Sequence, residues 1–346
     1  MNIKEFEYNL PKELIAQFPA ACREQSRLLV IDRKHGRIRH ALFKDIAEFL
    51  KNFDAIVLND AKVRPVKLYG VLNGKETDVL LVQRIGRNEY LFKAKPYKKF
   101  KPGTRVSFGP DKLTALCKER DIANQSKKIL QFQTNVDVES ILENIGFMPL
   151  PPYIKRSPQA ADNTQYQTVY ARCPGAIASP TAGLHFTEGI LGKLKEKGVK
   201  IIFVTLHVGL GTFEPVRSEN IRRHKIHEEN FALTKEAARE IEQTKAAGGR
   251  ICAVGTTSCR VLESCAEHYG GNFKMNAQSA NTDLFIYPPY NFKATDMLLT
   301  NFHLPRTTLL MLVCAFAGSR LCFKAYREAV KNKYRFYSYG DCMLII

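Results

Sequence analysis

The stretch KGVKIIFVTLHVG (residues 197–209) carries the strongest fold signal of the chain. Gly198 ends a helical pattern over 188–197, and the apolar, β-branched run 199–206 follows at once. A continuous apolar run of this kind is typical of a strand that is covered on both faces. The stretch therefore predicts a helix followed by a buried strand, which is the repeating unit of an α/β fold.

The same alternation continues towards the C-terminus. Thr234 is placed to cap a helix that ends before Gly248, and Pro305 and Gly318 bracket another helix. The expected elements are strands over 250–254 and 297–300, a turn over 255–258, and helices over 234–247, 259–268 and 305–317. Elements in this order predict a mixed sheet layered by helices.

Between residues 63 and 133 the pattern changes to short β-like runs separated by Gly, Asn and Pro. The expected strands cover 66–72, 78–85, 90–94, 105–108, 113–117 and 129–133. Many short strands at near-regular spacing indicate a small antiparallel β-barrel or sandwich. The apolar run 55–58, just before this region, needs the later α/β strands as partners. We therefore expect a discontinuous α/β domain, residues 1–62 and 150–346, with a β-barrel domain inserted at 63–149.

Length and charge set independent limits. The chain has 346 residues, enough for about two domains. It carries 52 Lys plus Arg against 34 Asp plus Glu, a net charge of +18. This excess favours a polyanionic partner such as nucleic acid, although a basic proteome or a membrane surface would favour the same excess.

The cysteines and the apolar runs indicate the cellular compartment of the protein. The chain has nine scattered cysteines, an odd number, and Cys252, Cys259 and Cys265 lack the spacing of a zinc site. We expect reduced thiols in a cytoplasmic protein. The start MNIKEFEYNL lacks the apolar region of a signal peptide, and the longest apolar run, 309–317, is too short to span a bilayer. The sequence thus predicts neither a metal site nor a membrane segment.

Polar residues follow three of the expected strands. They are His207, Gly209 and Gly211 after the first, 255–258 after the second, and Asn301 and His303 after the third. Because ligands of open α/β sheets bind outside the carboxyl ends of the strands, we expect one crevice at these positions. The GxGxxG fingerprint of Rossmann folds is missing, and so are a P-loop, GxSxG and HExxH. An ordinary Rossmann methyltransferase is therefore disfavoured.

Two of the polar segments allow either a binding or a structural reading. GTTSCR (255–260) places Thr256, Thr257 and Ser258 at the start of a helix, where amide groups attract a carboxylate or a phosphate. Ordinary helix capping by these hydroxyls is the alternative. SPTAGLHFT (179–187) leaves the same choice open, because Thr181 and His185 belong either to a site or to an architectural turn.

Two other segments are rich in cations. The residues are Lys95, Lys98, Lys99 and Lys101 in KAKPYKKFKPGTR (93–105), and Arg222, Arg223 and Lys225 in RRHKIHEE (222–229). Their charges would meet phosphates, and Tyr97 and Phe100 would stack on unpaired bases. A solvated loop is the alternative for the first segment. In the second, His224 and His227 have a spacing that suits a metal on a helix, but nothing in the chain completes a ligand set.

Eight short segments together resemble one family, the S-adenosylmethionine:tRNA ribosyltransferase-isomerases of queuosine biosynthesis. They are SRLLVID (26–32), LPPYIKR (150–156), YQTVYA (166–171), SPTAGLHFT (179–187), TLHVGLGTFEPV (205–216), TDLFIYPPY (282–290), TNFHLP (300–305) and YRFYSYGDCMLI (334–345). No single segment is decisive, but their number and order cover the whole chain. The resemblance also implies an α/β domain interrupted by a small β-barrel.

The resemblance implies a reaction. Members of the family attach the ribosyl part of S-adenosylmethionine to 7-aminomethyl-7-deazaguanine at the wobble position of tRNA with a GUN anticodon. The product is epoxyqueuosine, and adenine and methionine are released. S-adenosylmethionine is then a co-substrate, with no permanently bound cofactor, and we expect a monomer. Because the sulfonium acidifies the C5′ hydrogens of the ribose, one base of near-neutral pKa would start the chemistry.

The resemblance and the strand ends together assign candidate roles. The proton-transfer candidates are His207, His303, His185 and Asp283, with Asp60 as a further carboxylate that would hold an imidazole or a ribose hydroxyl. The candidates for binding the co-substrate are Thr181, Gly209, Gly211, Thr256, Thr257, Ser258 and Asn301. Three positions depart from the family pattern, which usually has Gly-Glu at Ala280 and Asn281 and Arg at Gln165.

Two other functions remain open on the sequence. One is an S-adenosylmethionine-dependent tRNA methyltransferase without a Rossmann fold, which would leave S-adenosylhomocysteine. The other is a noncatalytic RNA-binding protein that uses the β domain, for which the polar segments at the strand ends would be unnecessary.

Overall fold

The chain folds into two compact units in the computed structural model, which describes residues 1–109, 113–122, 125–209, 216, 218–269 and 272–346. The first unit comprises Met1–Lys62, Pro152–Arg156 and Gln165–Ile346, and we call it the α/β unit. The second comprises Val63–Pro151 and Ser157–Thr164, and we call it the barrel unit.

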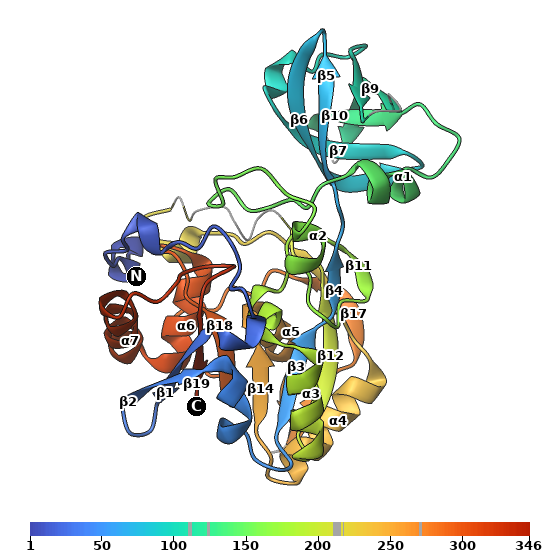
Figure 1. Cartoon of the computed structure of the whole chain (residues 1–346). Helices are drawn as coiled ribbons and strands as arrows, with labels where there is room; N and C mark the ends of the chain where they lie inside the picture. The colour runs from blue at the N-terminus through green and yellow to red at the C-terminus, as the bar shows by residue number, and fades with distance from the viewer. Residues whose placement is uncertain (110–112, 123–124, 210–215, 217, 270–271) are drawn as a thin grey trace. The chain divides into compact units, whose positions relative to one another are not determined.

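The α/β unit is built on a nine-stranded mixed sheet with the order β17-β13-β12-β3-β14-β18-β19-β1-β2 (Figure 1). The strands are β1 (Arg27–Asp32), β2 (Arg37–Leu42), β3 (Ala55–Asn59), β12 (Lys200–Leu206), β13 (Glu229–Leu233), β14 (Ile251–Val254), β17 (Gln278–Thr282), β18 (Met297–Asn301) and β19 (Cys342–Ile345). The strands β12, β3, β14 and β18 run parallel to one another, so their carboxyl ends meet at one edge. The expected mixed sheet is confirmed.

Helices cover both faces of this sheet. One hydrophobic core packs the sheet against α4 (Lys235–Ala246), α5 (Gly255–Cys265), α6 (Thr308–Ala317) and α7 (Ser319–Lys331). The other core packs it against the 3-10 helix η4 (Phe43–Phe49) and α3 (Glu188–Glu196). Every residue of β3, β14 and β18 is buried as a result, whereas β12 alternates buried and partly exposed positions.

Three local expectations in this unit were wrong. We expected a turn over 255–258, but α5 begins at Gly255, whose φ of 87° reverses the chain at one residue. That helix ends at Cys265, and residues 266–268 belong to the hairpin of β15 (Ala266–Tyr269) and β16 (Asn272–Met275). The helix expected from Pro305 begins only at Thr308, where the Thr307 side chain caps it by accepting from the N–H of Leu310 at 3.3 Å.

The long apolar run is a core element. It forms α6, which is almost wholly buried, and Gly318, with φ 81°, separates it from α7. Within the described residues no single helix has the length and apolar character of a membrane span, although α6 and α7 pass that test as a pair bent by 114°.

The barrel unit is a closed antiparallel barrel of six strands with the order β10-β7-β6-β5-β8-β9. The strands are β5 (Lys67–Leu72), β6 (Lys75–Gly86), β7 (Glu89–Lys95), β8 (Arg105–Phe108), β9 (Leu113–Ile122) and β10 (Gln125–Phe132), and α1 (Val138–Ile145) packs on their core. Asn73 and Gly74, with φ of 51° and 73°, form the tight turn between β5 and β6, as an Asn-Gly pair favours. The antiparallel barrel expected from the strand spacing is confirmed.

The chain also contains three short elements outside the large sheet and the barrel. They are β4 (Ala61–Val63), which pairs with β11 (Cys173–Ala176), and α2 (Asp162–Gln165). The nine cysteines are all unpaired, and seven of them are buried.

Candidate functional site

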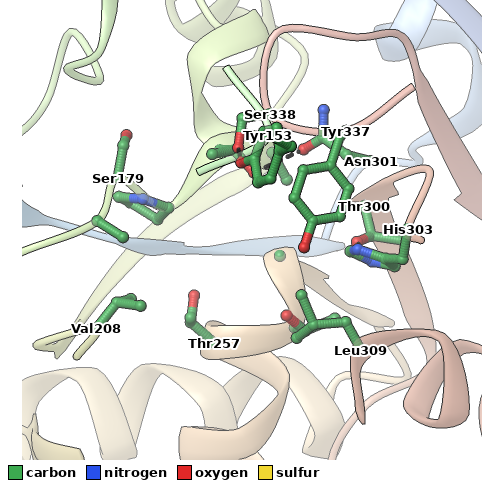
Figure 2. Close-up of a pocket in the computed structure, with 16 residues that line it drawn as sticks. Tyr153, Ser179, Val208, Thr257, Thr300, Asn301, His303, Leu309, Tyr337 and Ser338 are labelled. Carbon is green, nitrogen blue, oxygen red and sulfur yellow. Dashed lines mark hydrogen bonds between the residues drawn. The ribbon is translucent and has the colours of Figure 1, made fainter. Parts of the chain in front are cut away.

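An open pocket with about 530 Å³ of empty space lies at the carboxyl edge of the parallel strands. We call it the strand-end pocket (Figure 2). Its wall residues are Tyr153, Ala178, Ser179, Pro180, Thr181, Ala182, Val208, Gly255, Thr256, Thr257, Thr300, Asn301, His303, Leu309, Tyr337 and Ser338. The pocket lies where the topology of an open α/β sheet favours a ligand site.

The structure brings only part of the expected site into this wall. Of the expected residues, those in the wall are Thr181, Thr256, Thr257, Asn301 and His303. Outside the wall are His185, His207, Gly209, Ser258 and Asp283, while Gly211 lies outside the described residues.

His303 follows β18 by two residues and is held by its surroundings. Its Nε2 lies 2.9 Å from Thr300 Oγ1, and its peptide N–H donates to the hydroxyl of Tyr326 at 3.1 Å. Burial lowers the pKa of His303 to about 3. The imidazole is therefore neutral at pH 7 and has a fixed orientation in the wall.

His185 lies behind the wall, at the end of the 3-10 helix η6 (Thr181–His185). Its Nε2 accepts from Asn301 Nδ2 at 3.2 Å, and Asn301 Oδ1 accepts from Thr181 Oγ1 at 3.0 Å. Burial, together with the positive charges of Arg23 and Arg335, lowers the pKa of His185 to about 3. The neutral ring thus supports Asn301, which in turn faces the pocket.

The N-terminus of α5 opens on the pocket without a side-chain cap. Val254 is the N-cap residue and makes no capping bond, so the capping alternative for GTTSCR is not what the structure has. Thr257 Oγ1 is buried and has no hydrogen-bond partner among the described residues, and the same holds for Ser179 Oγ. The hydroxyl of Ser258 instead donates to the carbonyl of Val254 at 2.8 Å, which turns it away from the pocket.

Five polar wall residues were not among the predicted site residues: Tyr153, Ser179, Thr300, Tyr337 and Ser338. Figure 2 shows the hydroxyl end of Tyr337 pointing into the pocket. Its backbone has φ 74°, a left-handed conformation that is rare for a bulky residue, and its side chain is only 6% exposed. Strained backbone often marks a functional position. The cluster of tyrosines in YRFYSYGD was the available signal, but the strain cannot be read from the sequence.

A buried ion pair ties α5 to two neighbouring loops. Arg260 of α5 pairs with Glu229 and also donates to the carbonyls of Thr282 and Leu284 at 3.2 and 3.0 Å. The other carboxylate oxygen of Glu229 accepts from the N–H of Gly209 at 3.0 Å. Breaking such a buried pair typically costs about 3–5 kcal/mol, so these contacts hold the loops beside α5.

His207 and Asp60 have structural partners away from the wall. The peptide N–H of His207 donates to Asn230 O at 2.9 Å, and its ring packs against Gly175, where a Cβ atom would lie 2.8 Å from Cε1. Asp60 accepts from Arg172 Nε and Thr205 Oγ1, both at 2.6 Å, rather than from an imidazole. Asp283 is exposed.

The two cationic segments are exposed in their own units. Lys95, Lys98, Lys99 and Lys101 lie on the barrel unit, and Arg222, Arg223 and Lys225 lie on the α/β unit. Tyr97 is 42% exposed, with Lys128 Nζ 4.8 Å from its ring centre. Phe100 is fully buried in the barrel core, so our expectation that it stacks on bases was wrong.

The histidines of RRHKIHEE do not share a helical face. The 3-10 helix η8 (Ile221–Arg223) ends before His224, and His227 follows in irregular chain. The described residues contain no group of three or more His, Cys, Asp or Glu that would hold a metal ion.

Comparison with known proteins identifies the family. The model of a family described as queuosine biosynthesis protein matches residues 3–345. The S-adenosylmethionine:tRNA ribosyltransferase-isomerases of Halothermothrix orenii and Staphylococcus haemolyticus are 49% and 47% identical to this chain, each over the full length of both proteins. A crystal structure of S-adenosylmethionine tRNA ribosyltransferase from Thermotoga maritima is 39% identical, with a TM-score of 0.56 over 99% of this chain and 100% of that one. The chain therefore belongs to the queuosine biosynthesis family of S-adenosylmethionine:tRNA ribosyltransferase-isomerases.

Proposed function

We propose that this enzyme transfers and isomerises the ribosyl moiety of S-adenosylmethionine onto 7-aminomethyl-7-deazaguanine at the wobble position of tRNA. The product is epoxyqueuosine-tRNA, with release of adenine and methionine. The observation that carries the proposal is the strand-end pocket, in which buried hydroxyls that have no partner within the described part of the chain meet an uncapped helix N-terminus. Buried polar groups are normally satisfied, so these hydroxyls are suited to contact a ligand.

The methionine end of S-adenosylmethionine fits the start of α5. Its carboxylate would accept from the free amides of the first turn and from Thr256 and Thr257, with the positive end of the helix dipole adding attraction. The sulfonium would lie against the ring of Tyr337, since aromatic faces attract cations. The wall of the pocket contains neither a carboxylate nor an ammonium group among the described residues, so its contacts to this charged ligand would be hydrogen bonds, the helix dipole and the aromatic ring.

We assign the first proton transfer to His303, because it is the one of our four candidates that lies in the wall. A base must be unprotonated to remove the C5′ proton, and burial keeps this imidazole neutral at pH 7. The same lowered pKa makes it a weaker base than the near-neutral group expected from the sequence, so its position in the wall carries the assignment. His207, His185 and Asp283 lie outside the wall and take second place. Burial raises the pKa of Tyr337, so its hydroxyl keeps its proton and would donate to the purine or the ribose.

The exposed cations would bind the RNA. Lys95, Lys98, Lys99 and Lys101 on the barrel unit, and Arg222, Arg223 and Lys225 on the α/β unit, would neutralise phosphates of a tRNA with a GUN anticodon. The net charge of +18 supports a polyanionic partner. We further propose that the enzyme acts as a monomer in the cytoplasm, where thiols stay reduced.

Product analysis tests the proposal. The protein is mixed with S-adenosylmethionine and a tRNA that carries 7-aminomethyl-7-deazaguanine. The small molecules and the RNA are then separated, identified and quantified by mass spectrometry. We expect one adenine and one methionine for each epoxyqueuosine formed, and neither with a tRNA that carries guanine at that position. S-adenosylhomocysteine would instead identify a methyltransferase, and binding without any product would identify an RNA-binding protein.

A further inference from the structure

A second pocket lies beside the strand-end pocket within the α/β unit. It contains about 480 Å³ of empty space, and its wall includes Arg23, Ser26, Gln165, His185 and Ser338. We call it the Arg23 pocket. The reaction steps assigned above do not use it.

The two pockets adjoin across one pair of side chains. His185 lies in the wall of the Arg23 pocket, and its Nε2 is 3.2 Å from the Nδ2 of Asn301, which faces the strand-end pocket. Ser338 lies in the walls of both pockets. A ligand with two linked parts could therefore place one part in each pocket.

The charge of the Arg23 pocket is positive. Arg23 is the formally charged side chain of its wall, which contains no carboxylate among the described residues. His185 is neutral, because its pKa is lowered to about 3.

Such a wall selects an anion with several oxygens. A guanidinium keeps its proton and pairs with phosphate or carboxylate through two parallel hydrogen bonds. Ser26 and Gln165 add a hydroxyl and an amide that can donate to the same group. The carboxylate of the co-substrate is already placed at α5, whereas a nucleotide of RNA carries both a base and a phosphate on one ribose.

We propose that the Arg23 pocket binds a phosphodiester group that flanks the reacting nucleotide of the RNA, with Arg23 as the main contact. The base then reaches the strand-end pocket past Ser338 and the pair of His185 and Asn301. This inference rests on the proposed function, because it takes the RNA nucleotide as the second substrate.

A double-substitution cycle tests it. Binding of an anticodon stem-loop RNA is measured with the wild type and with Arg23→Gln, using RNA that has either natural phosphates or one uncharged methylphosphonate beside the wobble nucleotide. We expect each single change to weaken binding by about tenfold or more, the usual worth of a hydrogen bond to a charged group. When the methylphosphonate stands at one of the two flanking positions, the two changes together should weaken RNA binding no more than either change alone. Arg37→Gln, which removes an exposed arginine of β2, should show simple additivity.

Three outcomes would overturn the inference. The first is additivity of Arg23→Gln with the methylphosphonate at both flanking positions. The second is a loss of S-adenosylmethionine affinity in Arg23→Gln with unchanged RNA affinity, which would assign the pocket to the co-substrate. If Arg23→Gln does not fold, Arg23→Met is used, which also removes the charge, and a methylphosphonate cost equal to that of the wild type is the third. Failure of the proposed function would appear separately, as a wild type that releases no adenine.

Discussion

The strand-end pocket and the cationic loop of the barrel unit present polar groups in opposite ways. In the pocket, Thr257 and His303 are buried and uncharged at pH 7. On the barrel unit, Lys98 and Lys99 are exposed and charged. Buried neutral groups act over the length of a hydrogen bond and depend on position, whereas exposed charges act at longer range and are screened by salt. We infer that the pocket supplies selectivity for a small co-substrate and that the loop supplies attraction for a polyanion.

The largest effect should come from His303. Replacing it with Gln should lower turnover about 10²–10⁴-fold, the usual worth of a positioned acid or base, while RNA binding stays unchanged. Adenine release in a single turnover and RNA binding at fixed salt are the two measurements. His207→Gln is the matched control, since His207 also follows a strand but lies outside the wall, and it should cost less than tenfold. The reverse ranking would move the base to His207.

The lysines of the barrel unit should determine how strongly salt weakens tRNA binding. Changing Lys95, Lys98, Lys99 and Lys101 to Ala should weaken tRNA binding roughly fivefold to tenfold, near 0.1 M salt, for each phosphate that is no longer neutralised. The slope of log affinity against log salt should fall by about one per phosphate, and thermal stability should not change because the side chains are exposed. For the single change Lys98→Ala, the control is the single change Lys75→Ala, since Lys75 is also exposed on the barrel unit. An unchanged slope in the fourfold variant would make this segment a solvated loop.

Acid should destabilise the two units differently. His185 and His303 have a pKa of about 3 in the folded chain, against about 6.5 when unfolded. The unfolded chain therefore binds more protons below pH 6.5, and each histidine lowers the free energy of unfolding by up to about 1.4 kcal/mol per pH unit as the pH falls towards 3. Above pH 6.5 this dependence should vanish. All eight histidines lie in the α/β unit.

Urea unfolding of the α/β unit between pH 4.5 and 7.5 measures this slope, and hydrogen exchange of the barrel amides gives the internal control. His185→Asn should remove one histidine's share of the slope. A slope that His185→Asn leaves intact would mean that His185 is protonated in the folded chain.

The smallest effect should come from Thr257. Thr257→Val keeps the shape and removes a hydroxyl that has no partner among the described residues, so stability should not fall. The affinity for S-adenosylmethionine should drop about threefold to tenfold, as expected for one neutral hydrogen bond. Ser258→Ala is the control, because the Ser258 hydroxyl donates to the carbonyl of Val254 and its removal should leave the affinity unchanged. Equal reductions of affinity in both variants would contradict a direct contact from Thr257.

Much of the fold could be predicted from local patterns. The cap of α4 illustrates this, since Thr234 Oγ1 accepts from the N–H of Ala237 at 3.1 Å at the position that its sequence neighbours indicate. The barrel strands were predictable for the same reason, because turn residues and alternation act within a few positions. The start of α5 was not, because Gly255 has a left-handed φ that replaces a four-residue turn by a single residue.

The site was predictable as a region but not residue by residue. His207 and His303 both follow parallel strands, and the sequence alone makes them equivalent. In the structure, one packs against Gly175 and the other faces the strand-end pocket. Tyr153 and Tyr337 reach that pocket from segments 184 residues apart in the chain, and no local pattern links them.

The sequence by itself thus determined the α/β class with its inserted barrel, most of the central strands, and the edge of the sheet at which the strand-end pocket lies. These follow from periodicity, caps and turn residues, whose energies depend on neighbours in the chain. Only the tertiary structure decided which buried hydroxyls have no partner among the described residues, which histidine faces the pocket and that the backbone of Tyr337 is strained. The physical reason is that burial, side-chain direction and hydrogen-bond satisfaction depend on residues that are distant in the chain and meet only when it folds.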